Sequence, residues 1–270
     1  MKINVNEITI AYDIFGKPVA QPLFLIHGFG DCRLHMRSLA LRLSAERRVI
    51  CYDCRGHGQS TKPEKYSLED HGRDLVALLD AFGYERADVV GFSMGSYVAG
   101  QSAILSPHRV RRLVLICPKA YDSGCGSSIT EYFVRRGFEQ GIVTNNEQKK
   151  RLISEAVWSP ATSPELRAAV SATFRDIRTD PEYSPMSADD HARAVDSLKG
   201  FDLRSGYAIL GSKTLVISAQ HDGFNPYPLG WEISSIIPDC RFKLILNAAH
   251  NVIYEAEEEL SDCIRDFLRE

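Results

Sequence analysis

Residues 91–95 read GFSMG, a G-x-S-x-G pattern that places Ser93 between two glycines. An apolar run at residues 87–90 precedes this stretch, and a helix-like run at residues 96–101 follows it. Glycines on both sides allow a sharp strand-to-helix turn, because a Cβ atom at those positions would collide with neighbouring backbone. The pattern therefore predicts a strained turn that exposes the Ser93 hydroxyl and aims the following backbone N–H groups at whatever the hydroxyl attacks.

The motif alone occurs by chance in many chains, so the prediction of the fold depends on the surrounding sequence. Four other strand-like runs each lead into a loop that contains polar residues. They are residues 22–26 before the HGFG loop at 27–30, residues 48–52 before the DCRGHGQS loop at 53–60, residues 214–218 before Asp222, and residues 242–246 before His250. Serine, acid and histidine thus follow one another along the chain, each just beyond a predicted strand.

This set of motifs resembles the α/β-hydrolase superfamily, whose catalytic residues occur in the chain order serine, acid, histidine. The resemblance covers nearly the whole chain apart from its middle segment. It implies an α/β fold with a mostly parallel central sheet and helices on both faces. Within the superfamily, the loops and the G-x-S-M-G motif are most similar to lid-bearing serine esterases and lactonases of the 3-oxoadipate enol-lactonase type.

The order of the predicted elements leads to the same fold class. Strand and helix patterns alternate, which indicates a mostly parallel sheet. Alternation at residues 3–15 predicts an N-terminal antiparallel pair of strands with a turn at Asn6 and Glu7. Residues 67–82 predict an amphipathic helix that begins at a capping box of Ser67 and Asp70 and stops at Gly83.

The sequence changes character between about residues 119 and 204, where strand-like runs disappear. Helical patterns occur instead at residues 128–140, 146–157, 164–178 and 187–199. We expect a hydrolase core at residues 1–118 and 205–270, and a helical lid, or cap, at residues 119–204. The insertion falls at the carboxyl edge of the sheet, where catalytic loops gather. The alternative is a set of peripheral helices that only thicken the fold.

A serine hydroxyl is a weak nucleophile at neutral pH and needs a base within hydrogen-bond reach. We predict that His250 is this base and that Asp222 is the carboxylate that orients it. Asp122, which follows the strand after the motif, is the alternative acid. The backbone N–H groups of Phe29 and Met94 are predicted to stabilise the tetrahedral oxyanion.

The predicted function is hydrolysis of a small carboxylic ester or lactone through an acyl-enzyme on Ser93. Acyl transfer, perhydrolysis and carbon–carbon bond hydrolysis on the same residues stay open, as does a small-molecule receptor with little turnover. Trp158 is the first candidate for a substrate contact among the aromatic residues of the middle segment, which are Tyr132, Phe133, Phe138, Trp158 and Phe174. These side chains are equally consistent with an internal core of that segment. Basic residues at positions 135, 136 and 149–151 either meet an anionic substrate or form a solvated helix face.

Composition limits the remaining classes of function. The 270 residues are 44 % hydrophobic and 25 % charged, as in an ordinary globular protein, and the net charge of −3 gives no reason to expect nucleic acid or a membrane as partner. The first residues lack the apolar run of a signal peptide, and the odd number of seven cysteines suits reduced thiols, so we expect a cytoplasmic protein. Cys51 and Cys54 have C-x-x-C spacing without a second Cys/His pair, so no metal and no cofactor is expected. The oligomeric state is left open.

Overall fold

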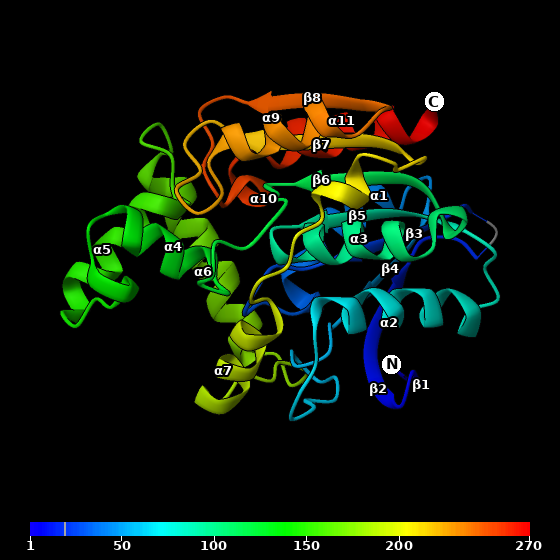
Figure 1. The fold of residues 1–270 in the computed structure, drawn as a ribbon, viewed down its shortest axis with the longest axis horizontal. Helices are drawn as coiled ribbons and strands as arrows, with labels where there is room; N and C mark the ends of the chain where they lie inside the picture. The colour runs from blue at the N-terminus through cyan, green and yellow to red at the C-terminus, as the bar shows by residue number, and fades with distance from the viewer. Residues whose placement is uncertain (19) are drawn as a thin grey trace.

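The computed structural model describes residues 1–18 and 20–270. Its centre is an eight-stranded sheet in the order β1-β2-β4-β3-β5-β6-β7-β8 (Figure 1). The strands are β1 (Lys2–Val5), β2 (Ile8–Phe15), β3 (Pro22–Ile26), β4 (Arg48–Tyr52), β5 (Ala87–Phe92), β6 (Val110–Ile116), β7 (Lys213–Ala219) and β8 (Cys240–Ile245). The pairs β1–β2 and β2–β4 are antiparallel, and all other neighbours are parallel. The predicted α/β class with a mostly parallel sheet is confirmed.

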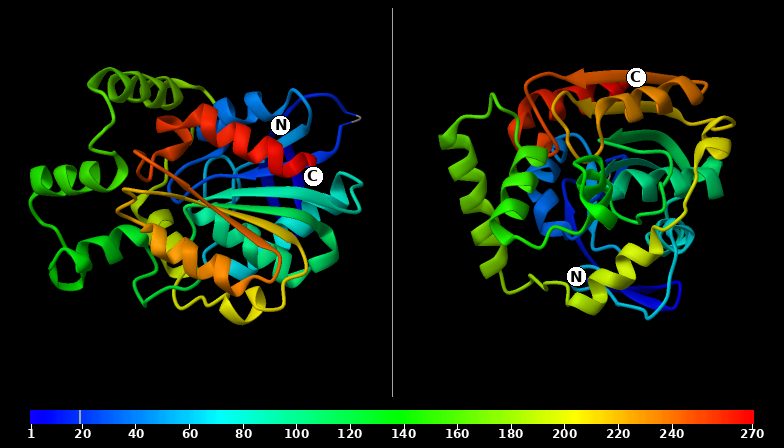
Figure 2. Two further views of the ribbon diagram at one scale, coloured as in Figure 1. Left: turned by 90° about the horizontal axis from the view of Figure 1, so that it is seen from above. Right: turned by 60° about the vertical axis from the view of Figure 1, so that its left-hand side comes forward.

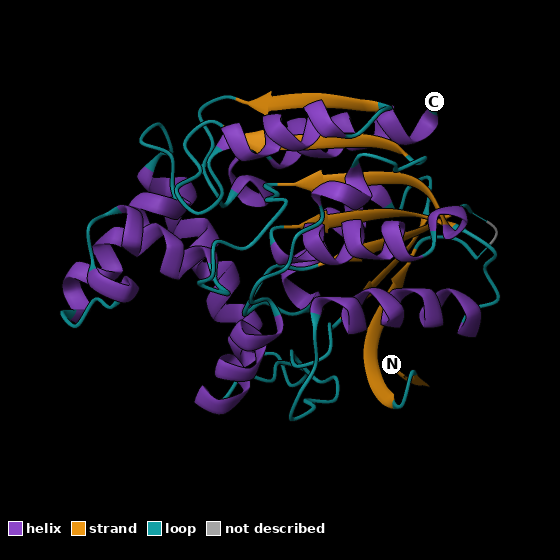
Figure 3. Cartoon of the chain, viewed as in Figure 1, coloured by secondary structure: helices purple, strands orange, loops and turns teal. Residues whose placement is uncertain are grey.

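Successive side chains of a strand point to opposite faces of the sheet, so each face has its own apolar core. In β3, Phe24 and Ile26 belong to one buried cluster, and Leu23 and Leu25 belong to the other. Figures 2 and 3 show helices on both sides of the sheet. The first cluster includes α2 (Leu68–Ala81), α3 (Met94–Leu105) and α9 (Tyr227–Ile236), and the second includes α1 (Arg37–Leu43) and α11 (Glu257–Arg269).

Two local predictions near the N-terminus are confirmed by the backbone. Asn6 and Glu7 form the turn between β1 and β2, and both have positive φ, 46° and 64°, as a two-residue hairpin turn of the type I′ class requires. At the start of α2, the Ser67 side chain accepts from the N–H of Asp70, whose carboxylate accepts from the N–H of Ser67. Gly83 follows the helix with a φ of 71°.

Between β6 and β7 lies a helical segment that we name the helical insert, residues 119–204. It contains α4 (Ser128–Arg135), α5 (Asn146–Val157), α6 (Pro164–Thr179) and α7 (Ala188–Ser197). Figure 3 shows that the arrows of the parallel strands point toward this insert. The helix predicted for residues 128–140 is too long, because Gly137 adopts a φ of 86° and the N–H of Phe138 donates to the carbonyl of Phe133 at 3.0 Å. These features end α4 early.

Shorter helical turns connect these elements, namely η1 (Arg33–Met36), η2 (Pro107–Arg109), η3 (Glu139–Gly141), α8 (Arg204–Tyr207) and α10 (Val252–Glu255). Among the helices of residues 1–18 and 20–270, none combines the length and the apolar character needed to cross a membrane. Cys51 lies inside β4 and Cys54 in the loop after it, and burial raises the pKa of both thiols. Because cysteine binds metals as the thiolate, these two residues are better described as core residues.

Candidate active site

Ser93 stands at the junction of β5 and α3 with a φ of 52° and a ψ of −118°. This conformation is rare for a residue with a side chain, and the Ser93 N–H supports it by donating to the carbonyl of Ile116 at 2.9 Å. A Cβ at Gly91 would lie 2.1 Å from the carbonyl oxygen of Gly95, and one at Gly95 would lie 2.3 Å from that of Ile26. The sharp turn predicted from GFSMG is therefore present, and it depends on both glycines.

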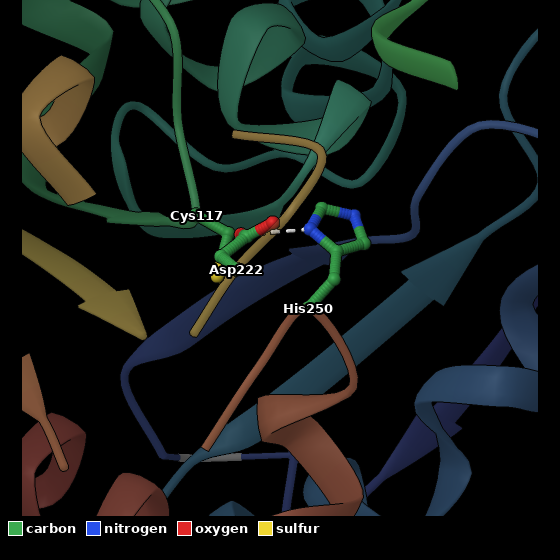
Figure 4. A group of neighbouring side chains, drawn as sticks. All are labelled: Cys117, Asp222 and His250. Atoms are coloured by element: carbon green, nitrogen blue, oxygen red, sulfur yellow. Dashed lines mark hydrogen bonds and ion pairs between the residues drawn. The ribbon is translucent and has the colours of Figure 1, made fainter. Parts of the chain in front are cut away.

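A hydrogen-bonded chain joins three of the predicted site residues. Nε2 of His250 lies 3.0 Å from Oγ of Ser93. Nδ1 of the same ring lies 2.8 Å from Oδ2 of Asp222 (Figure 4). Because a carboxylate can only accept, Nδ1 carries the proton in this pair and Nε2 is left to accept from the serine. The three buried side chains come from the loops after β5, β7 and β8.

The loop after β7 orients the carboxylate of Asp222. Its Oδ1 accepts from the N–H groups of Phe224 and Asn225, each at 2.9 Å, which leaves Oδ2 for His250. Asp122, the alternative acid, is occupied elsewhere. Its carboxylate accepts from three glycine N–H groups within 3.0 Å, those of Gly124, Gly126 and Gly200. The structure thus pairs the histidine with Asp222 and not with Asp122.

The Ser93 hydroxyl borders a cavity of about 340 Å³. Phe29, in the loop after β3, and Met94, the first residue of α3, line the same cavity. Neither backbone amide donates to another residue of 1–18 or 20–270. N–H groups in the first turn of a helix lack intrahelical acceptors and carry partial positive charge, so the Met94 amide suits an oxyanion.

The aromatic residues of the helical insert divide into two groups. Trp158 and Phe174 line the cavity. The guanidinium of Arg167 lies 5.7 Å from the centre of the Trp158 ring, close enough to stack on it. The others belong to an apolar cluster that joins the insert to the loop after β7; it comprises Tyr132, Phe133, Leu152 and Ala156 of the insert and Phe224 of the loop, with Phe138 packed against it.

The basic residues considered for an anionic substrate lie outside the lining of this cavity, as far as the described residues go. Arg136 and Arg151 pair with Glu155, and Lys150 pairs with Glu147, all at exposed positions. Arg135 instead donates to the carbonyls of the acid loop, at Gly223 and Phe224. Arg136, Lys150 and Arg151 therefore fit the second interpretation, that of basic residues on a solvated helix face.

The end of α5 is joined directly to the loops of the acid and the histidine. The N–H of Gly223, next to Asp222, donates to the carbonyl of Ala156 at 3.0 Å. The N–H of Asn251, in the histidine loop, donates to the carbonyl of Val157 at 3.0 Å. Backbone hydrogen bonds therefore tie the helical insert to the segments that position the hydrogen-bonded chain.

Glu255 reinforces this junction. Its carboxylate accepts from the N–H of Ser159 at 2.8 Å and from the hydroxyl of Thr162, both in the helical insert. Its other oxygen accepts from the N–H of Ala249 at 2.7 Å, immediately before His250. We did not identify Glu255 from the sequence, because nothing in its local pattern distinguishes it from the neighbouring glutamates of residues 255–259.

Two aromatic rings contact the histidine and were also missed. The ring centre of Phe224 lies 5.0 Å from that of His250, and the ring centre of Phe92 lies 5.2 Å from it. Phe92 occupies the first variable position of GFSMG, and Phe224 follows the acid by two residues. Because both residues lie close to predicted site residues in the sequence, their positions could have indicated a contact with the histidine.

Cys117 lies behind the acid, at the end of β6 (Figure 4). Ligand atoms of Cys117, Asp222 and His250 all lie within 4.8 Å of one another. Burial, together with the nearby Asp222 carboxylate, raises the pKa of the Cys117 thiol well above its ordinary value. A thiol held in its neutral form, beside an acid and a histidine that already pair with each other, fits a hydrogen-bonded network better than a metal centre.

The two histidines of the glycine loops, His27 and His57, form hydrogen bonds with the backbone. The His27 ring contacts the carbonyl of Gly28 at 2.7 Å and accepts from the N–H of Cys54 at 3.0 Å. The His57 ring contacts the carbonyl of Arg55 at 3.0 Å. Burial lowers the pKa of His27 to about 4 and that of His57 to about 3, so both rings are neutral at physiological pH.

Comparison with known proteins extends these observations. A family model described as alpha/beta hydrolase fold matches residues 21–257. A putative carbamate hydrolase, RutD, from Variovorax paradoxus is 25 % identical over 246 residues, which cover 88 % of each chain. The 2-hydroxymuconate semialdehyde hydrolase of Pseudomonas putida is 27 % identical over 92 % of this chain and 87 % of that protein. The enol-lactonase from Burkholderia xenovorans LB400 superimposes with a TM-score of 0.82 at 24 % identity, covering 100 % of both chains, which shows a shared fold.

Proposed function

Because this chain belongs to the alpha/beta hydrolase fold family, we propose that it is a serine hydrolase that cleaves a small carboxylic ester or lactone through an acyl-enzyme on Ser93. The observation that carries this proposal is the continuous hydrogen-bonded chain from Asp222 through His250 to Ser93 at the wall of a cavity. An enol-lactonase is among the proteins that share the fold. Relatives named as a putative carbamate hydrolase and a 2-hydroxymuconate semialdehyde hydrolase support hydrolysis as the class of reaction.

Acylation starts when Oγ of Ser93 attacks the ester carbonyl carbon and His250 takes its proton at Nε2. The imidazolium that forms is stabilised by Asp222 through the Nδ1–H hydrogen bond. The carbonyl oxygen becomes an oxyanion, and the backbone N–H groups of Phe29 and Met94 bind it. A donor of this kind lowers the barrier by about 3 kcal/mol.

The tetrahedral intermediate then collapses. Nε2 of His250 returns the proton to the leaving oxygen, which departs as an alcohol or, from a lactone, stays attached to the acyl chain. A water molecule next gives its proton to His250 and attacks the acyl carbon. His250 then returns this proton to Oγ of Ser93 as the bond between the acyl carbon and Oγ breaks, which releases the carboxylic acid and restores the Ser93 hydroxyl.

We assign the helical insert, residues 119–204, as the lid over this site. Trp158 and Phe174 contribute to the cavity wall from the insert, whereas Ser93, Asp222 and His250 belong to the core. A lid that covers the serine excludes bulk water, which strengthens hydrogen bonds to the oxyanion. Trp158, as one of the side chains that line the cavity, is our first choice in the lid for a substrate contact.

The test is turnover of a panel of short esters, lactones and thioesters by the purified protein, together with labelling by a fluorophosphonate. Ser93→Ala should abolish both, since the nucleophile is lost. Ser102→Ala is a matched control, because Ser102 is also buried on α3 but donates only to the carbonyl of Val98. Labelling without turnover of any ester would favour another reaction or a receptor, and labelling of Ser93→Ala would place the nucleophile elsewhere.

A further inference from the structure

The cavity contains a buried lysine that the proposed reaction leaves without a role. Lys119 follows β6 by three residues and is only 3 % exposed, yet it lines the same cavity as Ser93. Its ammonium nitrogen lies 5.9 Å from the ring centre of Tyr97 and 5.6 Å from that of Phe201, and both rings line the cavity too. A buried charge is unfavourable unless hydrogen-bond or ion-pair partners compensate it.

An ammonium group has three N–H donors. In Lys119 one donates to Oε1 of Glu131 at 2.6 Å, and another reaches Oδ1 of Asp122 at 3.5 Å. No acceptor for the third donor occurs among residues 1–18 and 20–270. Since Lys119 borders the cavity, this donor is available to a bound molecule.

Two hydroxyl groups of the cavity lining, those of Tyr97 and Ser128, already have hydrogen-bond partners. The Asn225 side chain donates to the Tyr97 hydroxyl at 2.7 Å and accepts from the Ser128 hydroxyl at 2.8 Å. The Tyr97 and Ser128 oxygens lie 3.2 Å apart, which closes the network. Lys119 is therefore the charged donor that this part of the cavity offers to a ligand.

The charges around Lys119 decide which acceptor fits. Two carboxylates, Glu131 and Asp122, already face the single ammonium, and Asp31 adds another carboxylate to the cavity lining. Arg135 approaches Glu131 only to 4.0 Å from a partly exposed position. A ligand carboxylate would meet excess negative charge in a buried setting, where repulsion is strong. A neutral carbonyl or hydroxyl oxygen would accept the hydrogen bond without that repulsion.

The apolar lining comes from other elements, with Ile153 and Val157 on α5 and Phe174 on α6. A ligand that fills the cavity must therefore combine hydrocarbon with at least one oxygen. We propose that Lys119 forms a subsite for a neutral hydrogen-bond acceptor, so that the preferred ester or lactone carries a ketone, hydroxyl or amide oxygen away from the bond that is cleaved. This inference rests on the proposed function for the reaction and adds the class of substrate.

The test compares three methyl esters of similar size: methyl 5-oxohexanoate, methyl hexanoate and monomethyl glutarate. The ketone should be hydrolysed with a kcat/KM about tenfold higher than the alkyl and carboxylate esters, as expected for one hydrogen bond to a charged donor. A second pair, 4-oxopentyl acetate and pentyl acetate, places the ketone on the alcohol side. A preference for the ketone in one of the two series supports the subsite, and equal rates in both series overturn it.

The variants must avoid leaving two buried carboxylates without a cation, since that alone destabilises a fold. Lys119→Met is therefore combined with Glu131→Gln, and Glu131→Gln alone is the matched control. The double variant should hydrolyse methyl 5-oxohexanoate and methyl hexanoate with about equal kcat/KM, so that the ketone preference is lost. The control should retain the ketone preference and accept monomethyl glutarate better than wild type, because one negative charge is gone. A uniform loss on all esters in the double variant would overturn the subsite.

Binding measurements test the Lys119 subsite independently of the proposed hydrolysis reaction. Ser93→Ala protein, with and without the double substitution, is titrated with methyl 5-oxohexanoate and methyl hexanoate, and the fluorescence of Trp158 in the cavity wall reports occupancy. Tighter binding of the ketone that depends on Lys119, without turnover of any ester by wild type, would reject the proposed reaction and retain the subsite. Turnover with equal binding of the two esters would reject the subsite and retain the reaction.

Discussion

His250 is held through both ring nitrogens, and only Oδ2 of Asp222 is available to Nδ1. Asp222→Asn keeps an oxygen for the N–H groups of Phe224 and Asn225 but replaces the acceptor for the histidine with an amide donor. The ring then adopts the wrong tautomer, and kcat for a minimal acetyl ester should fall roughly 10⁴-fold with the fold retained. Steady-state kinetics and a thermal melt measure the two effects.

Asp122→Asn provides the comparison for that substitution. Its carboxylate stabilises the loop of Gly124 and Gly126 and does not contact His250, so the variant should lose stability and keep its turnover per folded molecule. The opposite pattern, with activity lost in Asp122→Asn and retained in Asp222→Asn, would show that the acid is misassigned.

Individual residues differ in how far the sequence alone reveals them. Ser93 and His250 are recognisable because each lies just beyond a strand-like run, Ser93 inside GFSMG, and because they occur in the chain order serine, acid, histidine. Lys119 and Glu255 are not, because their roles arise from tertiary contacts: Lys119 contacts Glu131 on α4, and Glu255 contacts Ser159, which lies 96 residues earlier in the chain. Such contacts depend on how the loops are packed, which no local pattern encodes.

At the scale of elements, the C-terminal end of α5 brings Trp158 into the cavity wall while Phe133 on α4 packs inside the insert. Trp158→Ala should change the ranking of esters by acyl length, because the wall of the pocket recedes, and should leave a minimal acetyl ester largely unaffected. Phe133→Leu is the matched control and should lower the melting temperature without altering the ranking. Chain-length profiles of kcat/KM check both, and an unaltered ranking in Trp158→Ala with a lower melting temperature would remove its substrate contact.

The junction between α5, α10 and the histidine loop depends on Glu255. In the wild type, one carboxylate oxygen of Glu255 accepts from the N–H of Ser159 and the other from the N–H of Ala249. Glu255→Gln replaces one of these acceptors with an amide NH₂ group, so the free energy of unfolding should fall by about 1–3 kcal/mol. Because Ala249 precedes His250, kcat should fall as well, with KM little changed. Glu258→Gln, at an exposed position of α11, should change neither. Full kcat in a destabilised Glu255→Gln would restrict this residue to a structural role.

The elements themselves were largely predictable from local patterns. The alternation that predicted β1 and β2 and the capping box of α2 are short-range patterns, and both are retained in the folded chain. The helix predicted for residues 128–140 failed at Gly137, where a residue free to adopt positive φ allowed the chain to reverse. The helical periodicity of apolar residues continues beyond Gly137, so this pattern did not predict the end of α4.

At the scale of the whole molecule, stability should depend on pH through the buried histidines. The pKa of His27 falls from an ordinary 6.5 to about 4 in the folded state, so the unfolded chain binds the proton first as pH decreases. The stabilisation by the neutral ring is complete above about pH 6.5, is lost progressively toward pH 4, and amounts to about 3 kcal/mol. Denaturation midpoints across this range measure the loss.

His27→Gln removes the titrating ring and retains a donor and an acceptor for the backbone. Its stability should therefore fall less steeply between pH 6.5 and 4 than that of wild type. His108→Gln, at an exposed position, should follow wild type. Parallel curves for wild type and His27→Gln would show that the acid sensitivity has another origin.

The backbone hydrogen bonds from Ala156 and Val157 to the acid and histidine loops have a consequence for engineering and for divergence within the family. A helical insert transplanted from a relative would bring its own carbonyls to Gly223 and Asn251. In such a chimera Ser93, Asp222 and His250 would be intact, but the carbonyls of the transplanted insert would set the positions of the acid and histidine loops. A shift of these loops by a fraction of an ångström would slow catalysis. Exchange of substrate range between relatives should therefore succeed when the insert and these two loops are transferred as one unit.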